Sequence, residues 1–415
     1  MVVGLGFVSL AIDMVSDGAI SVSGALLEEL GASAVLVGTV TGTATAIALV
    51  LRLVTGPWAD RSGAYWAFTI VGYAMSAVSV PLLALTPVLG SASLAAASAL
   101  LITERTGKAV RGPAKTVLLA DAAGAVGRGR GFGVHKLLDQ IGAFAGPLVV
   151  AGVAAVTGAL WPAFLVLLIP AAVAMVLLFW LRARVPDPSV YRAGDTAPTA
   201  RATPAEASAA PVRMSLAARL SGLAAIPGHV RTTFLLFAAF AALTTFGLLS
   251  FGIVSYHLAA AELVPIAAVP LVYAAGMAAA AVGAVVTGWA YDRIGASVLL
   301  AVPLLTALVP GLALGGTVAL VLTGVVIWGL ATGVQDSTVK ALVADLVPAE
   351  QRGSAYGWFA VFQGLGALAG AVVAGALYAN LPLLVVLVVA LQVAASVLLV
   401  VVLRRHRSER RADAG

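Results

Sequence analysis

The chain has 415 residues, of which 61% are hydrophobic and 10% are charged, and its mean hydropathy is +1.06. Soluble domains carry about 25% charged residues, so this composition excludes a soluble globular protein and indicates an integral membrane protein. The absence of cysteine excludes disulfides, thiolate metal ligands and thiol catalysis. Basic cytoplasmic loops account for the net charge of +6, so we expect no nucleic-acid partner.

Apolar runs rich in Ala, Val, Leu and Gly recur along the chain, and each is long enough to cross a bilayer as a helix of about 20 residues. Membrane strands would instead show alternation and frequent turn residues. The N-terminal stretch MVVGLGFVSLAI lacks a basic segment and is predicted to be a first span rather than a signal peptide. We predict an all-α integral membrane protein with twelve spans at 2–27, 34–57, 65–89, 92–120, 131–156, 158–182, 233–256, 266–289, 297–315, 318–345, 354–378 and 381–403.

Basic residues concentrate on one side of these predicted spans. With the N-terminus inside, the outer connections contain Glu28, Glu29 and Glu262 and no Lys or Arg. Because Lys and Arg are enriched in cytoplasmic loops, we expect a multi-pass protein of the cell (inner, plasma) membrane with both termini in the cytoplasm. The inner connections contain Arg61, Arg128, Arg130, Arg182, Arg184, Arg293 and Arg352.

The spans fall into two blocks of six. We predict an N-terminal six-helix bundle at 1–182, a C-terminal six-helix bundle at 232–403 and a basic cytoplasmic tail at 404–415. The segment between the bundles, 183–231, is rich in Pro, Ala, Ser and Thr, which is typical of a disordered linker. Its last part predicts a short amphipathic helix on the inner membrane surface, with an apolar face formed by Met214, Leu216, Leu220, Leu223 and Ile226.

The two blocks repeat one another in sequence. The stretch GPWADRSG at 56–63 matches GWAYDRIG at 288–295, and LLADAAGAVGRGRGFG at 118–133 matches LVADLVPAEQRGSAYG at 342–357. Two helical halves of common ancestry, joined by an inner linker, are typical of secondary transporters.

The chain resembles the major facilitator superfamily on these motifs. The superfamily's loop signature between spans two and three is present as Gly56, Asp60, Arg61 and Gly63, although Trp58 stands where Leu is usual. The stretch GAFAGP in span five is similar to the G-x-x-x-G-P signature of drug–proton antiporters in the superfamily. Together, DMVSD, ERTGKAVRGPAK, HKLLDQIGAFAGP and ALVADLVPAEQRG resemble a prokaryotic subgroup whose members are known only as transporters.

The resemblance implies the twelve-helix fold with two pseudo-symmetric bundles, and transport by alternating access. Residues at the inner rim are then expected to latch or gate the two conformations. Helix caps and positive-inside residues are the alternative interpretation of the same positions. The predicted gating residues are Gly56, Asp60, Arg61, Gly63, Asp121, Arg128, Gly146, Pro147, Asp292, Arg293, Asp345 and Arg352.

Charged side chains inside the predicted spans form stripes at helical spacing. Glu104, Lys108, Arg111 and Lys115 fall within an arc of roughly 60° on span four. Because an ion at mid-membrane costs at least about 2.5–3.5 kcal/mol, such residues should face the bundle interior or a cavity. We predict a substrate and proton pathway formed by Asp13, Asp17, Glu104, Lys108, Arg111, Lys115, His135, Asp139, Asp336 and Lys340.

The same charges have a structural interpretation, as buried ion pairs that add little net stability. In that case Glu104 pairs with Lys108, Asp13 or Asp17 pairs with Arg111 or Lys115, and Asp336 pairs with Lys340.

Three functional hypotheses for these residues stay open. The first is proton-coupled transport of a small molecule, with efflux favoured by the span-five motif and with Asp13, Asp17, Glu104 and Asp139 as proton carriers. The second is a transporter for a divalent metal, held by Asp13, Asp17, His135 and Asp139, or for an organic anion. The third is a membrane enzyme, which we rank last because the chain has no P-loop, no G-x-S-x-G and no H-E-x-x-H. A sensor or scaffold is a further alternative. We expect no cofactor and no resident metal, and a monomer in the lipid bilayer.

Overall fold

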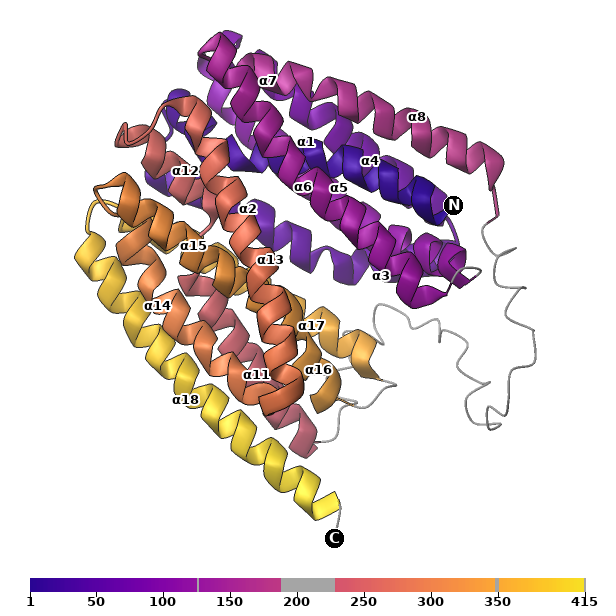
Figure 1. The fold of residues 1–415 in the computed structure, drawn as a ribbon, viewed down its shortest axis with the longest axis vertical. Helices are drawn as coiled ribbons and strands as arrows, with labels where there is room; N and C mark the ends of the chain where they lie inside the picture. Colours follow the sequence, from indigo (N-terminus) through magenta and orange to yellow (C-terminus); the bar gives the residue numbers. More distant parts are fainter. Residues whose placement is uncertain (125–126, 188–227, 348–350, 414–415) are drawn as a thin grey trace.

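A computed structural model describes residues 1–124, 127–187, 228–347 and 351–413 (Figure 1). All regular structure in these residues is helical. Most of the predicted linker, including its amphipathic helix, lies outside the described residues. The described chain forms two helical bundles that lie side by side in Figure 1.

The first bundle contains the first six spans. Several spans consist of two consecutive helices, with a short break between them. Its helices are α1 (Val2–Glu29), α2 (Ala34–Val50), α3 (Arg52–Ser62), α4 (Tyr65–Leu82), η1 (Leu83–Val88), η2 (Gly90–Ala92), α5 (Ser93–Gly124), α6 (Arg128–Thr157), α7 (Trp161–Val166) and α8 (Leu168–Arg184).

The second bundle repeats this arrangement with the remaining six spans. Its span seven is divided into α11 and α12, and its span ten passes through a π-helical turn. Its helices are α11 (Gly228–Gly247), α12 (Phe251–Ala260), η4 (Ile266–Ala268), α13 (Val269–Ile294), η5 (Gly295–Leu300), α14 (Ala301–Ala313), α15 (Val318–Val334), the π-turn η6 (Gln335–Val339), α16 (Lys340–Leu346), α17 (Arg352–Ala376) and α18 (Leu381–Asp413).

The twelve predicted spans are confirmed, with most edges within a few residues. In the described residues, nine helical segments are long and apolar enough to cross a membrane, and one of them, Ile266–Ala313, contains two spans. The charged α5 and the shorter Val318–Val334 complete the set. The last helix continues to Asp413, so the described part of the predicted basic tail is helical.

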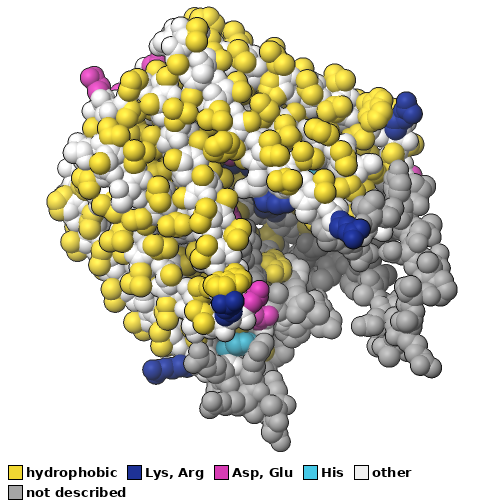
Figure 2. Space-filling model, viewed as in Figure 1, with side chains coloured by type: hydrophobic (Ala, Val, Ile, Leu, Met, Phe, Trp, Pro, Cys, Tyr) yellow, Lys and Arg dark blue, Asp and Glu magenta, His cyan; other side chains and the backbone are white. Residues whose placement is uncertain are grey.

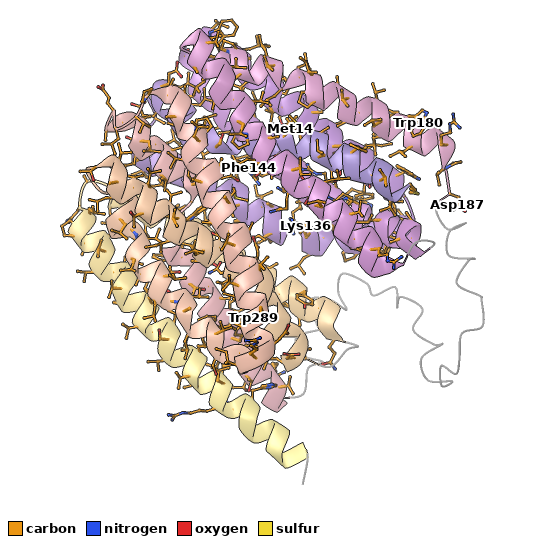
Figure 3. The ribbon with its side chains drawn as sticks, viewed as in Figure 1. Met14, Lys136, Phe144, Trp180, Asp187 and Trp289 are labelled. Atoms are coloured by element: carbon orange, nitrogen blue, oxygen red, sulfur yellow. The ribbon has the colours of Figure 1, made fainter. Side chains whose placement is uncertain are left out.

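Apolar side chains cover most of the face of the molecule that Figure 2 shows. Two exposed tryptophans, Trp180 on α8 and Trp289 on α13, each lie against an arginine one turn further on (Figure 3). The guanidinium carbon of Arg293 lies 3.5 Å from the ring centroid of Trp289, and that of Arg184 lies 5.4 Å from the ring of Trp180. Trp and Arg at helix ends are typical of the membrane–water interface, so these pairs indicate one boundary of the apolar band.

Glycines let α1 and α6 of the first bundle pack closely together. Gly142 and Gly146 of α6 face the backbone oxygens of Leu10 and Met14 on α1, and a Cβ at either glycine would collide with those oxygens. Small residues allow helix backbones to approach closely in membranes. The close approach of α1 and α6 is therefore fixed by the GAFAGP stretch.

The two bundles contact one another through α1 with α12 and through α2 with α17. The Gly24 amide donates to Ser255 Oγ at 3.0 Å, and Thr41 Oγ1 and Ser250 Oγ are 2.8 Å apart. Figure 2 shows a hollow between the bundles, with Lys or Arg side chains visible inside it. The ends of the described chain lie toward the side on which this hollow opens.

We predict that Gly146→Ala destabilises the protein by about 1–3 kcal/mol, because the added methyl group cannot fit against Met14 without moving α6 away from α1. Gly152→Ala on the same helix is the control, since nothing lies within 4 Å of a Cβ there. The control should be neutral or stabilising, because alanine is the better helix former. Thermal unfolding in detergent measures both, and equal midpoints for the two variants would contradict the packing argument.

Candidate functional site

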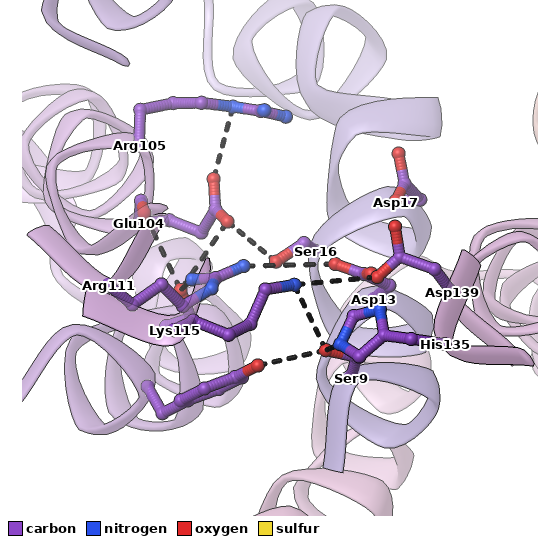
Figure 4. Close-up of polar contacts among 12 residues, drawn as sticks. Ser9, Asp13, Ser16, Asp17, Glu104, Arg105, Arg111, Lys115, His135 and Asp139 are labelled. Atoms are coloured by element: carbon purple, nitrogen blue, oxygen red, sulfur yellow. Dashed lines mark hydrogen bonds and ion pairs between the residues drawn. The ribbon is translucent and has the colours of Figure 1, made fainter. Parts of the chain in front are cut away.

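Helices α1, α5 and α6 bring five of the predicted pathway residues into one buried network (Figure 4). Arg111 Nη2 lies 3.8 Å from Asp13 Oδ1, and Lys115 Nζ lies 3.6 Å from Asp139 Oδ1. A pair between Asp13 and a base of span four was one of the predicted alternatives, and the structure forms it with Arg111. Asp139 also pairs with Lys136, at 3.3 Å.

Ser9 is the hydrogen-bonding centre of this network and was not predicted. Its hydroxyl lies 2.9 Å from the Tyr73 hydroxyl and 3.1 Å from His135 Nε2, and it accepts from Lys115 Nζ at 3.1 Å. His135 therefore contacts Ser9, whereas Asp139 forms an ion pair with Lys115. A serine one helical turn before Asp13, on the same face of α1, was the available sequence signal.

Glu104, which precedes Arg111 by two helical turns on α5, forms the second part of the site. It accepts from Ser16 Oγ at 2.6 Å and pairs with Arg105 Nε at 3.1 Å. The alternative pairing of Glu104 with Lys108 is not formed. Arg111 donates to Ser76 Oγ at 2.7 Å, and its guanidinium carbon lies 5.0 Å from the ring centroid of Tyr73.

Lys108 lies between these two groups. It attracts both Asp13 and Glu104 electrostatically, yet its ammonium group has no ion pair within 4.0 Å and no hydrogen bond to a described residue. The side chain is partly exposed. An ammonium group in this position can bind an anionic group of a ligand.

Asp17 contacts the other bundle. The hydroxyl of Tyr273, on α13, donates to Asp17 Oδ1 at 2.8 Å. The predicted alternative of a pair with Arg111 or Lys115 is therefore formed by Asp13 and not by Asp17. Tyr273 packs edge-on against Phe251 with ring centroids 4.8 Å apart, which fixes its hydroxyl toward the first bundle.

A carboxylate of the second bundle interacts electrostatically with a base of the first bundle. Asp336 is exposed at the π-turn of span ten and is attracted electrostatically by Arg52 of α3 in the first bundle. Arg52 was not predicted, although an arginine inside the predicted span 34–57 was a signal for it. The side chain of Lys340 lies outside the described residues, so its predicted pairing with Asp336 stays a prediction.

The repeated loops differ in their contacts but share one backbone feature. Gly63 and Gly295 have φ of +64° and +65°, which favours glycine after α3 and after α13. Tyr65 donates to Asp60 Oδ1 at 3.3 Å, whereas Tyr291 donates to Asp345 Oδ2 at 2.6 Å.

The other predicted gating residues occupy varied surroundings, and their gating role stays a prediction. Gly56, Asp121, Gly146 and Pro147 are buried, Arg61, Asp292 and Arg293 are exposed, and the side chains of Arg128 and Arg352 lie outside the described residues.

The geometry does not favour the divalent-metal alternative. Within the described part of the chain, no group of three or more His, Cys, Asp and Glu side chains is placed to hold a metal ion. Asp13 and Asp139 face Arg111 and Lys115, whose positive charges would repel a cation.

The chain has twelve membrane spans in two repeated bundles and a network of charged side chains inside the first bundle. These features define the class of polytopic membrane transporters. The chain belongs to the Major Facilitator Superfamily, whose family model matches residues 5–314 and 235–415. The comparisons identify it as a transporter and not as an enzyme.

Mycobacterial proteins are similar to the chain over nearly its full length. Uncharacterized protein Rv2265 of Mycobacterium tuberculosis is 44% identical over 396 residues, which cover 95% of this chain and 90% of that protein. Uncharacterized protein Mb2288 of Mycobacterium bovis matches to the same extent.

Solved transporter structures share the fold. A mutant of the nucleoside transporter NupG has a TM-score of 0.71 at 13% identity, covering 97% of this chain and 99% of that one. A mutant of the peptide transporter POT has a TM-score of 0.69 at 17% identity, covering 98% and 95%. A bacterial homologue of the human lysosomal transporter Spinster, in an inward-facing and unoccupied conformation, has a TM-score of 0.66 at 15% identity, covering 98% and 95%.

We predict that Arg111→Met destabilises the protein by about 3–5 kcal/mol, because it leaves Asp13 buried without its guanidinium partner. Asp13→Asn combined with Arg111→Met should recover most of this loss, because no unpaired charge then remains. Chemical or thermal unfolding of the two single variants and the double variant measures the coupling. Additive effects of the two substitutions would show that the pair is not energetically coupled.

Proposed function

We propose that this chain is a proton-coupled secondary transporter that exports a small molecule by alternating access. The observation that carries the proposal is the largely buried network of Asp13, Arg111, Lys115 and Asp139, in which two carboxyl groups face two bases inside the first bundle. Intramembrane ionisable residues of this kind are functional by default, because structural needs alone rarely outweigh their cost in lipid. We place the protein in the cell's cytoplasmic membrane as a monomer, with both termini in the cytoplasm.

The proton is proposed to bind at the pair Asp13 and Asp139. Their carboxyl groups lie next to one another in Figure 4, held by α1 and α6, and each faces a base of α5. A proton on either carboxyl group reduces the repulsion between them and weakens the hold on Arg111 and Lys115. Because exchange requires the proton and the substrate to occupy the site in turn, the substrate is proposed to bind the ionised pair through hydrogen-bond donors and to leave when the pair is protonated.

The conformational change is proposed to break the contacts that close the side of the protein opposite the termini. The hydrogen bond from Tyr273 to Asp17 and the contact of Gly24 with Ser255 both join the two bundles. The hollow on the terminal side would then be the cytoplasmic opening. The GAFAGP stretch, which resembles the antiporter signature, supports export as the direction.

The coupling is tested in everted membrane vesicles with a dye that reports the transmembrane pH gradient. Compounds that raise the melting temperature of the purified protein are added, and an exported compound should dissipate the gradient by proton exchange. Asp139→Asn and Asp13→Asn should each abolish this response. Glu29→Gln, on the opposite side of the membrane, is the matched control and should retain it.

Two results would contradict the proposal. If both aspartate variants responded like the unmodified protein, the assigned proton carriers would be wrong. If Mn²⁺ or Zn²⁺ dissipated the gradient and none of the stabilising organic compounds did, the divalent-metal alternative would replace an organic substrate.

The hydrogen bond between Tyr273 and Asp17, which joins the two bundles, gives a further prediction. Tyr273→Phe should expose the buried outer contact more often, because one hydrogen bond to a charged group across the bundles is lost. The chain has no cysteine, so Ala25→Cys supplies a single thiol at a position that is 0% exposed in the described conformation. Labelling by a membrane-impermeant maleimide should be about tenfold faster in the Tyr273→Phe background. Tyr256→Phe is the control, and equal labelling rates in the two backgrounds would refute this role of Tyr273.

A further inference from the structure

Span seven is interrupted in the middle of the second bundle. α11 ends at Gly247 and α12 begins at Phe251, and Leu249 between them has φ of 54°. A leucine in the left-handed region is strained and persists only where its surroundings fix it. Here the Trp328 indole N–H donates to the Leu249 carbonyl oxygen at 3.2 Å.

Span ten is irregular at the same level of the bundle. α15 passes into the π-turn Gln335–Val339, and Gln335 is the first residue of that turn. Such π-turns occur frequently at functional sites because they re-aim side chains out of the regular helical pattern. Thr245 Oγ1 of α11 lies 3.4 Å from Gln335 Oε1, so the two irregular spans are in contact.

A cavity of about 150 Å³ lies between these two irregularities. A cavity of this volume accommodates one six-membered ring. Its wall combines hydroxyl and amide groups with apolar surface and carries no charge. The lining residues are Thr45, Thr245, Phe246, Leu248, Leu249, Ser250, Trp328, Thr332, Gln335, Ala367 and Ala371.

The hydrogen bonds of the lining threonines are already used within their own helices. Thr45 donates to the carbonyl oxygen of Thr41, and Thr245 and Thr332 donate to the carbonyl oxygens four residues before them. Ser250 Oγ and Thr41 Oγ1 form a hydrogen bond with each other at 2.8 Å. The indole N–H of Trp328 is bound to Leu249. These side chains therefore shape the cavity and offer oxygen lone pairs to a ligand. Their hydrogen-bond donors are already bound within the protein.

Gln335 is the exception among the lining side chains. The residue is 7% exposed, and its amide nitrogen Nε2 has no hydrogen-bond partner among the described residues. A buried polar group without a partner reduces stability, because its hydrogen bonds to water are not replaced. A ligand that accepts a hydrogen bond in this cavity would satisfy it.

We infer that this cavity is a neutral substrate subsite for a ring that carries a hydrogen-bond acceptor such as a carbonyl group, with Gln335 as the donor that recognises it. The inference rests on the proposed transport function and specifies its substrate class. The ring lies against Trp328 and Leu249, and its acceptor binds Gln335 Nε2.

The position of the subsite also relates it to the charged network. Trp328 lines the cavity and neighbours Tyr273, with ring centroids 6.5 Å apart, and Tyr273 binds Asp17. The aromatic pair therefore lies between the neutral cavity and the charged wall of the first bundle. A substrate that reaches both has a neutral ring at one end and an anionic group for Lys108 at the other.

The test uses the purified full-length chain and two probes of similar size. Benzamide has a ring with a carbonyl acceptor, whereas aniline has a ring of the same size with N–H donors and no comparable acceptor. Ala367→Cys places the chain's single thiol on the cavity wall without changing its polar groups. The readout is the rate of thiol modification by a small methanethiosulfonate reagent, with and without each probe.

Benzamide should slow modification at concentrations where aniline does not. Gln335→Leu should weaken protection by benzamide about tenfold, because one buried hydrogen bond is lost. The same variant should raise the melting temperature of the free protein, because it removes the unpartnered amide. Thr323→Val is the control, since Thr323 is exposed on α15 away from the cavity, and it should change neither property.

Three outcomes would overturn the inference. Equal protection by both probes, or unchanged protection in Gln335→Leu, would show that Gln335 does not recognise an acceptor. An unreactive thiol, or no protection by either probe, would show that the cavity does not admit a ring from solution. Because the measurement uses no proton gradient, failure of proton coupling in the vesicle assay would leave its result unchanged.

Discussion

The contact of α1 with α6 is the constraint on which the charged site depends. Gly142 and Gly146 let the α6 backbone touch the backbone oxygens of α1, and this proximity sets Asp139 beside Asp13. Asp13 can remain buried and Asp139 largely enclosed there, because α5 supplies Arg111 and Lys115 as their partners. A larger residue at either glycine would separate the helices and leave charges in lipid without partners, where each costs several kcal/mol.

The same network explains why the two bundles differ in chemistry although they repeat in fold. The first bundle concentrates its ions on three helices that satisfy one another. The second bundle has a broken span seven and a π-turn in span ten, and its corresponding cavity is neutral. Each half has a glycine with positive φ after the corresponding helix, at Gly63 and at Gly295. The repeat therefore conserves the backbone frame, while the side chains divide the chemistry between the halves.

Two contacts between the bundles are the ones that the proposed change of conformation would have to break. Tyr273 with Asp17 and Gly24 with Ser255 each join elements of different halves. One of these contacts ends on a carboxylate that lies one helical turn from Asp13. This arrangement gives a short physical route by which occupancy of the charged site can affect closure, because the same helix α1 carries both.

The sequence by itself determined the class of protein, the twelve spans, the twofold repeat and the charged faces of spans one, four and five. These features depend on the length of apolar runs and on helical periodicity, both of which are local. Only the tertiary structure decided the partners: Arg105 rather than Lys108 for Glu104, and Tyr273 for Asp17. Asp17 and Tyr273 are 256 positions apart, so their contact depends on how helices rotate and pack against one another. The break at Leu249 could not be predicted from the sequence either. Its strained backbone is fixed by Trp328 from another helix and not by residues next to it.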